Sequence, residues 1–352
     1  MRKFYFILFI ALAPSLFAAE DDVLKLKNGD TLEVFITKES PTHIEYKDIK
    51  TGAVLKKHVD DVAFAVYKDA VHEYQEAIDY LERNNFSLAI KRLKIALGKQ
   101  KESRNNWHKD YIYFYMAYGY YGYAKANSNN TKFLEASLKI FTKISKTAKK
   151  TRCALDSKFY MANIQAILKK YPEANALLTE IDKFESKRPR LVAKSTALKA
   201  LILKGQGKNK DAVKLCSKLV MEGNASPELP ELLSSILIDE EKDYKQAKKL
   251  SLTMIKSSDK NTLRGAYEFK ANAEVFLKEY ESALDSVLMS QLLYGDPKKL
   301  SHRSNFVLAL SLKALMAKKA DKFPKWEYNN HYIRAAQALP SVQQKNLSKL
   351  KF

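Results

Sequence analysis

Apolar and polar positions alternate with a period of two near the start of the chain, from Val23 to Val66. The alternating stretches are separated by turn signals, among them Lys27-Asn28-Gly29-Asp30 and Lys50-Thr51-Gly52. Alternation places every second side chain on one face of a strand, and glycine adopts the positive φ that tight turns require. The pattern predicts a small all-β module that depends on a neighbour for stability.

Beyond residue 67 the spacing becomes helical, and small residues recur in pairs that are 12 positions apart. Each pair brackets a short polar break, as expected where two antiparallel helices cross closely on either side of a tight turn. From the second pair to the fifth, the second members step by 38, 35 and 36 residues. The pairs are Ala77 and Ala89, Ala162 and Ala174, Ala200 and Ala212, Ser235 and Ala247, and Ala271 and Ala283.

This periodicity resembles the tetratricopeptide repeat (TPR), a helix pair of about 34 residues. Tyr80, Leu93 and Ala96 also match positions of the family pattern, whereas Ser251 and Ser290 depart from it. The resemblance implies a mainly α fold, an α-solenoid of antiparallel helix pairs over residues 67–320, with a degenerate capping helix and basic tail at 321–352. Ala124 and Ala136 mark an irregular unit, in which a lengthened helix over 108–126 precedes a longer loop.

The string LKLKNGDTLEVFITKESPTHIEYKDIKTGAVLKKHVDDVAFAV resembles the SH3-like or Sm-like barrels at the start of some exported bacterial repeat proteins. The resemblance implies a small β barrel over residues 19–66. Sm-like barrels often bind RNA, but a dock for the helices or for a partner strand fits an exported chain better.

The N-terminus has the features of a secretory signal peptide, predicted to cover residues 1–18. Arg2 and Lys3 precede an apolar core from Phe4 to Leu12, and the sequence around Ala18 suits cleavage. A retained N-terminal anchor is the alternative. We therefore expect an exported protein, periplasmic or secreted, with no transmembrane segment after cleavage. Export permits a disulfide between Cys153 and Cys216, but their apolar surroundings favour two buried free thiols.

The chain is strongly basic, with 61 Lys and Arg against 40 Asp and Glu and a formal charge of +21. This charge favours an anionic partner, such as an acidic protein, although lysines that merely coat a solvated helix are the plainer explanation. Scarce arginine and export both argue against nucleic acid. A basic stripe is predicted at Lys139, Lys143, Lys146 and Lys150, continued by Lys149 and Arg152.

Candidate chemistry is sparse. The six histidines are scattered, and the sequence contains no nucleophile elbow, P-loop or dinucleotide fingerprint. Ser257 to Lys260 matches S-x-x-K without its companion motifs, and the acidic turn around Asp239 lacks a glycine-bent loop. We expect no catalysis, no cofactor and no metal site.

The most unusual segment runs from Tyr111 to Tyr123 and contains seven tyrosines. It predicts either an aromatic platform for a ligand or ordinary packing between repeats. In the TPR family the first helix of each unit lines a peptide-binding groove, and the resemblance carries groove places over to Tyr74, Ile78 and their counterparts in later units. The candidate ligand-binding residues are Tyr118, Tyr121, Lys125, Phe159, Asn163 and Lys194.

These observations predict an exported, non-enzymatic scaffold that binds a protein partner through the concave face of its solenoid. The alternative is a cell-envelope polysaccharide or anionic-surface binder that uses the tyrosine platform and the basic stripe.

Overall fold

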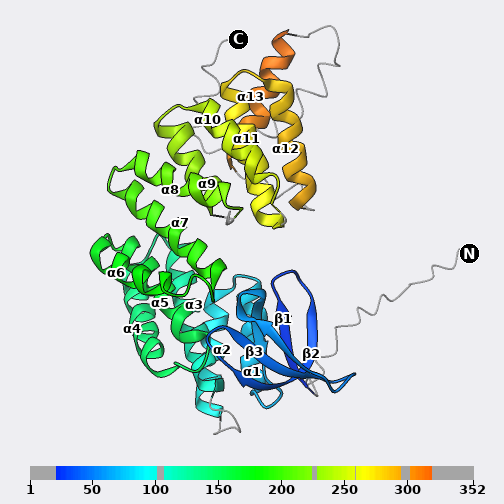
Figure 1. Cartoon of the computed structure of the whole chain (residues 1–352), viewed down its shortest axis with the longest axis vertical. Helices are drawn as coiled ribbons and strands as arrows, with labels where there is room; N and C mark the ends of the chain where they lie inside the picture. The colour runs from blue at the N-terminus through cyan, green and yellow to red at the C-terminus, as the bar shows by residue number, and fades with distance from the viewer. Residues whose placement is uncertain (1–20, 101–106, 224–227, 258, 295–301, 319–352) are drawn as a thin grey trace, which may run out of the picture. The chain divides into compact units, whose positions relative to one another are not determined.

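A computed structural model describes residues 21–100, 107–223, 228–257, 259–294 and 302–318 of the chain (Figure 1). The predicted signal peptide lies outside the described residues, as does the predicted tail at 321–352. The chain forms two compact units, residues 1–168 and 169–352. None of the described helices is long and apolar enough to cross a lipid bilayer.

The first unit begins with a five-stranded antiparallel sheet, which we call the β module (residues 22–66; blue in Figure 1). Its strand order is β4-β3-β2-β1-β5, so that the last strand returns to pair with the first. Gly29 (φ +97°) and Gly52 (φ +73°) supply the positive φ at the two predicted turns. The elements are β1 (Asp22–Leu26), β2 (Thr31–Glu39), β3 (His43–Asp48), β4 (Val54–His58), the 3-10 turn η1 (Val59–Asp61) and β5 (Val62–Val66).

The apolar positions that alternate in the sequence are the buried positions of the strands. Leu24, Val34, Ile36, Ile44 and Val62 are almost wholly buried. The described pairings run from β4 at one edge to β5 at the other. They confirm the predicted β module as a five-stranded antiparallel sheet.

Among its described residues the first unit also contains five helices: α1 (His72–Glu82), α2 (Phe86–Lys99), α3 (Trp107–Ala126), α4 (Thr131–Thr147) and α5 (Cys153–Ile167). The β module and these helices share one hydrophobic core. α3 is the lengthened helix that the sequence predicted. Ser137 of α4, one position after Ala136, is the small buried residue that meets α3, and its hydroxyl donates to the carbonyl of Ala117 at 2.7 Å.

The second unit is made of helices (green to orange in Figure 1). α9 continues directly into η2, which is π-helical. The elements are α6 (Tyr171–Asp182), α7 (Pro189–Gly205), α8 (Asn209–Met221), α9 (Leu229–Ser234), η2 (Ser235–Glu240), α10 (Tyr244–Met254), α11 (Lys260–Phe276), α12 (Tyr280–Tyr294) and α13 (His302–Lys318).

The repeat has a backbone signature beside its small residues. In five turns the residue five places before the second small residue has positive φ, although only one of the five is glycine. These residues are Asn84, Lys169, Gly207, Lys242 and Lys278. The second small residues themselves, Ala89, Ala174, Ala212, Ala247 and Ala283, are all fully buried. Helix pairs joined by one recurring turn therefore confirm the repeat that the 12-residue spacing predicted.

Candidate functional site

The tyrosines of α3 pack mainly inside the first unit. Tyr111 and Tyr115 are buried, and Tyr118 stacks edge-on against Phe86 and Tyr160. Tyr120 and Tyr123 both contact the ring of Phe133 on α4. None of the tyrosines of this stretch is fully exposed, so packing accounts for most of this aromatic cluster.

Five of the six predicted ligand-binding residues meet around Tyr160 of α5. The rings of Tyr118 and Tyr121 lie 5.4 and 5.5 Å from that ring, and Phe159 flanks it at 5.6 Å. The Tyr121 hydroxyl donates to Asn163 Oδ1 at 3.3 Å, and Lys125 Nζ lies 5.7 Å from the Tyr121 ring. Lys194 lies on α7 in the second unit and is half-buried.

The first groove position implied by the TPR resemblance, on α1, is not accessible to a ligand. Tyr74 and Ile78 of α1 are each 1% exposed, because the β module packs over them. The Tyr74 hydroxyl donates to the carbonyl of Ala65 on β5 at 2.9 Å, and Lys25 of β1 pairs with Asp79 and Glu82 of α1. Here the expectation of a ligand groove was wrong, since this chain fills the place with its own sheet.

A buried polar cluster joins the β module to the helices, and we define it as Glu39, Tyr67, Tyr111, Tyr115 and Arg152. Glu39 ends β2, and its carboxylate accepts hydrogen bonds from the Tyr67 hydroxyl and, at 3.0 Å, from the Tyr111 hydroxyl. Arg152, just before α5, donates to the carbonyls of Val62 and Ala63 on β5 at 2.6 and 2.9 Å, and to the Tyr115 hydroxyl at 3.0 Å.

Burial sets the electrostatics of this cluster. It raises the pKa of the Glu39 carboxyl to about 7, against the opposing effects of the Tyr67 hydrogen bond and the Arg152 charge. Arg152 was grouped with the surface lysines by sequence, which was wrong: its side chain is buried, whereas its lysine neighbours are exposed. The only signal was its identity, an arginine among lysines.

The predicted basic stripe lies on the solvent side of α4. Lys139, Lys143 and Lys146 are exposed along the helix, and Lys150 follows its end. Lys143 Nζ lies 4.6 Å from the centre of the Tyr113 ring, a cation–π contact. The lysines of the stripe therefore lie on the solvent-exposed face of α4 and just beyond its end.

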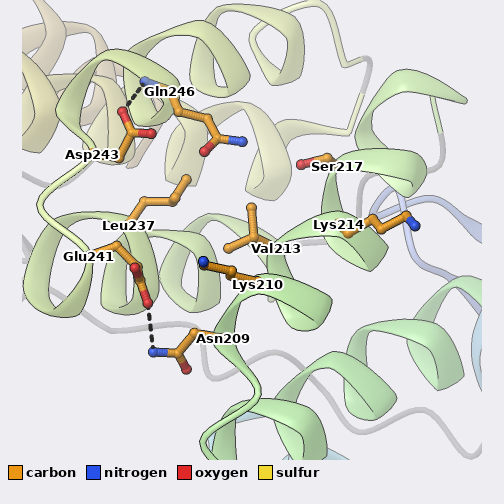
Figure 2. Close-up of a pocket in the computed structure, with 9 residues that line it drawn as sticks. All are labelled: Asn209, Lys210, Val213, Lys214, Ser217, Leu237, Glu241, Asp243 and Gln246. Carbon is orange, nitrogen blue, oxygen red and sulfur yellow. Dashed lines mark hydrogen bonds between the residues drawn. The ribbon is translucent and has the colours of Figure 1, made fainter.

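A cavity of the second unit lies between α8, η2 and the start of α10, and we call it the α8–α10 pocket (Figure 2). Its volume is about 540 Å³. Val213 and Leu237 form an apolar floor, and Leu237 belongs to the π-helical turn; such turns are frequent at functional sites. The other lining residues are Asn209, Lys210, Lys214, Ser217, Glu241, Asp243 and Gln246.

Two polar atoms of this pocket are buried without a hydrogen-bond partner in the described structure: Asn209 Oδ1 and Ser217 Oγ. The amide nitrogen of Asn209 is committed, since it donates to Glu240 and Glu241 at 2.7 and 3.1 Å. Asp243 is also committed, because its carboxylate caps α10 by accepting from the Gln246 backbone N–H at 3.0 Å.

The lysines of the pocket differ from those of its smaller neighbour. Lys210 and Lys214 form no ion pair within the described residues. A second cavity of about 270 Å³ between α7 and α8 also carries two lysines, but Lys199 pairs with Asp182, and Lys218 lies 3.8 Å from Glu222. Sequence reasoning missed the α8–α10 pocket, because it is made where two helix pairs meet.

Other candidate chemistry is limited within the described residues. Cys153 and Cys216 are free and buried, as expected, and burial raises the pKa of the Cys216 thiol to about 12. No group of three or more His, Cys, Asp or Glu in the described part of the chain could hold a metal ion. The described lining of the α8–α10 pocket includes one hydroxyl side chain, Ser217, and no histidine or cysteine that would activate it.

The chain is similar to several solved helical-repeat structures. The C-terminal part of a TPR repeat-containing protein from Cytophaga hutchinsonii is 14% identical, with a TM-score of 0.44 over 79% of this chain and 100% of that chain. A tetratricopeptide repeat protein from Parabacteroides merdae is 10% identical, with a TM-score of 0.40 over 76% and 99%. Rap protein complexed with competence and sporulation factor is 16% identical, with a TM-score of 0.37 over 80% and 76%. No protein-family model and no curated protein matches the sequence.

Proposed function

We propose that this protein is an exported, non-enzymatic scaffold whose helical repeats bind a protein partner. The observation that supports this best is the α8–α10 pocket, where an apolar floor is combined with polar groups that have no partner within the described chain. A folded protein loses free energy when it leaves such groups unsatisfied, unless a ligand or water satisfies them. A peptide supplies both apolar side chains and backbone hydrogen bonds.

The lining suits binding rather than acid–base or nucleophilic catalysis. Ser217 has no general base beside it among the described lining residues, and the carboxylate of Asp243 is used as a helix cap. The groove candidates on α3 and α5 are part of the same proposal as a second contact surface. Export rests on the signal-peptide features of residues 1–18.

The proposal is tested by filling the pocket. Ser217→Trp places an indole where a ligand would lie, and it is expected to abolish capture of a protein partner cross-linked from the envelope fraction of the native host. Lys249→Trp, at an exposed position of α10 outside the pocket, is the matched control. Capture that survives Ser217→Trp unchanged would contradict the pocket as the binding site.

The second candidate function is binding to an anionic polysaccharide or membrane surface through α4. The exposure of Lys139, Lys143 and Lys146 on one helix favours it. Attraction between exposed charges weakens steeply with salt, while docking on an apolar floor persists. Binding that disappears between low salt and about 0.5 M salt, together with loss in a Lys139, Lys143 and Lys146 triple Gln variant, would support this function instead.

A further inference from the structure

The α8–α10 pocket carries an inference about the chemistry of its ligand, which rests on the proposed function. We propose that the pocket selects an extended peptide segment with a single acidic side chain next to an apolar one. The unpaired lysines would bind the acidic group, and the apolar neighbour would pack on Val213 and Leu237.

The positive end of the pocket is defined by Lys210 and Lys214, which precede and follow Val213 on α8. Figure 2 shows the Lys210 ammonium directed toward the space between α8 and η2, while Lys214 extends to the outer side. Lys210 therefore meets an incoming carboxylate first. A charge-assisted hydrogen bond in a partly enclosed site is stronger than one between neutral groups.

The uncommitted neutral groups suit the backbone of such a peptide. The Ser217 hydroxyl both donates and accepts, whereas Asn209 Oδ1 is enclosed by the protein and is directed away from Lys210 in Figure 2. The Gln246 amide also lines this space. Extended backbone presents N–H and C=O groups together, which a hydrocarbon or a simple inorganic anion does not.

Two acidic residues of the same lining limit how many acidic groups the ligand carries. The Glu241 carboxylate accepts from the neutral Asn209 amide, and Asp243 follows two residues later in the turn before α10. A second acidic group of the ligand that comes near them would be repelled. The charge arrangement thus favours one acidic residue over a polyacidic run, and it disfavours sulfated or uronic polysaccharides.

The pocket also differs in place from the groove carried over from the TPR family. Most of its lining comes from the second helices α8 and α10 and from the turn before α10, and Leu237 comes from η2, at the end of a first helix. The groove places lie along first helices. The ligand proposed here would therefore bind beside the repeat turns.

The experiment selects random dodecapeptides displayed on phage against the full chain, followed by fluorescence anisotropy of the enriched peptides after labelling. We expect enriched peptides with one Asp or Glu adjacent to Leu, Ile, Val or Phe. Affinity should fall at least about tenfold in Lys210→Glu, because an attraction becomes a repulsion. It should stay within about twofold in Lys249→Glu, the same charge change on the exposed side of α10. Thermal melts verify that both variants fold.

The remaining outcomes separate this inference from the proposed function. Peptides that bind equally to Lys210→Glu, or that lack an acidic residue, would overturn the ligand chemistry and leave peptide binding intact. If no peptide is enriched while dextran sulfate binds the chain, both the inference and the protein-binding function fail. Competition by dextran sulfate for an enriched peptide would also overturn the single-acid selectivity.

Discussion

Two polar regions of this protein contain similar residues and use them in opposite ways. In the buried polar cluster, Glu39 and Arg152 are enclosed and bonded to tyrosine hydroxyls and to backbone carbonyls of β5. In the α8–α10 pocket, Lys210 has no ion-pair partner, and Ser217 Oγ has no hydrogen-bond partner within the described residues. In the buried polar cluster the polar groups bond to one another and hold the β module to the helices. In the α8–α10 pocket the Lys210 ammonium and the Ser217 hydroxyl have no such partner within the described residues.

The two regions differ in whether their polar groups hold the fold together or are left for the proposed binding. Buried charges persist where their partners belong to the same chain, since removing one partner strands the other. Exposed lysines at a surface cavity are tolerated without ion-pair partners because water solvates them, and a ligand then replaces that water. The comparison predicts large stability effects in the buried polar cluster and small ones in the pocket.

The largest effect is expected for Arg152→Leu. The change leaves the carbonyls of Val62 and Ala63 without their buried donor and removes the positive charge near Glu39. Breaking a buried, hydrogen-bonded charge cluster typically costs about 3–5 kcal/mol. Urea denaturation of the variant measures this loss, with Lys150→Leu, an exposed position two residues earlier, as the control. A loss below about 1 kcal/mol would show that Arg152 does not hold the β module.

The next effect is a pH dependence that Glu39 imposes. The pKa of the Glu39 carboxyl is about 7 in the folded protein, whereas its ordinary value is 4.5. The folded state therefore binds the proton more tightly than the unfolded state does. Stability is therefore highest below pH 4.5, falls as pH rises toward 7, and is level above that, with a total change on the order of 3 kcal/mol.

Glu39→Gln is expected to remove this contribution. The difference in unfolding free energy between wild type and variant, measured from pH 4.5 to 8.5, should move in favour of the variant up to about pH 7 and stay level above it. Glu33→Gln, on the exposed side of the same strand, is the control. A difference that is constant with pH would contradict the raised pKa of Glu39.

An intermediate effect is expected for the helix crossing on which the pocket is built. Ala212→Trp forces an indole between α7 and α8, where Ala212 is fully buried, and should destabilise the second unit by about 1–3 kcal/mol or more. Circular-dichroism melts detect the change. Lys218→Trp, on the exposed face of α8, should have the melting temperature of the wild type. If Ala212→Trp also melts at the wild-type temperature, Ala212 does not lie at a close helix crossing of the repeat.

The smallest effect is expected in the pocket itself. Ser217→Ala removes a hydroxyl that has no partner, and should change stability by less than about 0.5 kcal/mol. Tyr111→Phe removes a hydroxyl bonded to both oxygens of Glu39, and should cost about 1–3 kcal/mol. Both free energies of unfolding are measured by urea denaturation. Equal losses in the two variants would contradict the proposed difference between the buried polar cluster and the pocket.

Local patterns predicted the elements well, because strand alternation and the spacing of small residues are direct consequences of pleat and helix geometry. Gly29 and Gly52 marked real turns, and the recurring alanines marked real crossings. The pattern could not reveal that Arg152 reaches β5, some 90 positions earlier in the chain, since that contact depends on how the sheet packs against the helices.

The binding candidates show the same limit. Tyr121 and Asn163 do meet across α3 and α5, as their places in neighbouring first helices implied. Tyr74 occupies an equivalent place but is covered by the β module. The α8–α10 pocket depends on a π-helical turn and on Lys242 with positive φ, and neither feature has a signature in the alternation of apolar and polar residues.

We infer that ligands bind at the unpaired groups of the α8–α10 pocket. Hydrogen–deuterium exchange of the full chain, with and without a saturating acidic–apolar peptide from the display selection, tests it most directly. We expect slower exchange at residues 209–217 and 237–246, with no change along α4. Protection along α4, or over the Tyr118 and Tyr121 segment alone, would contradict it.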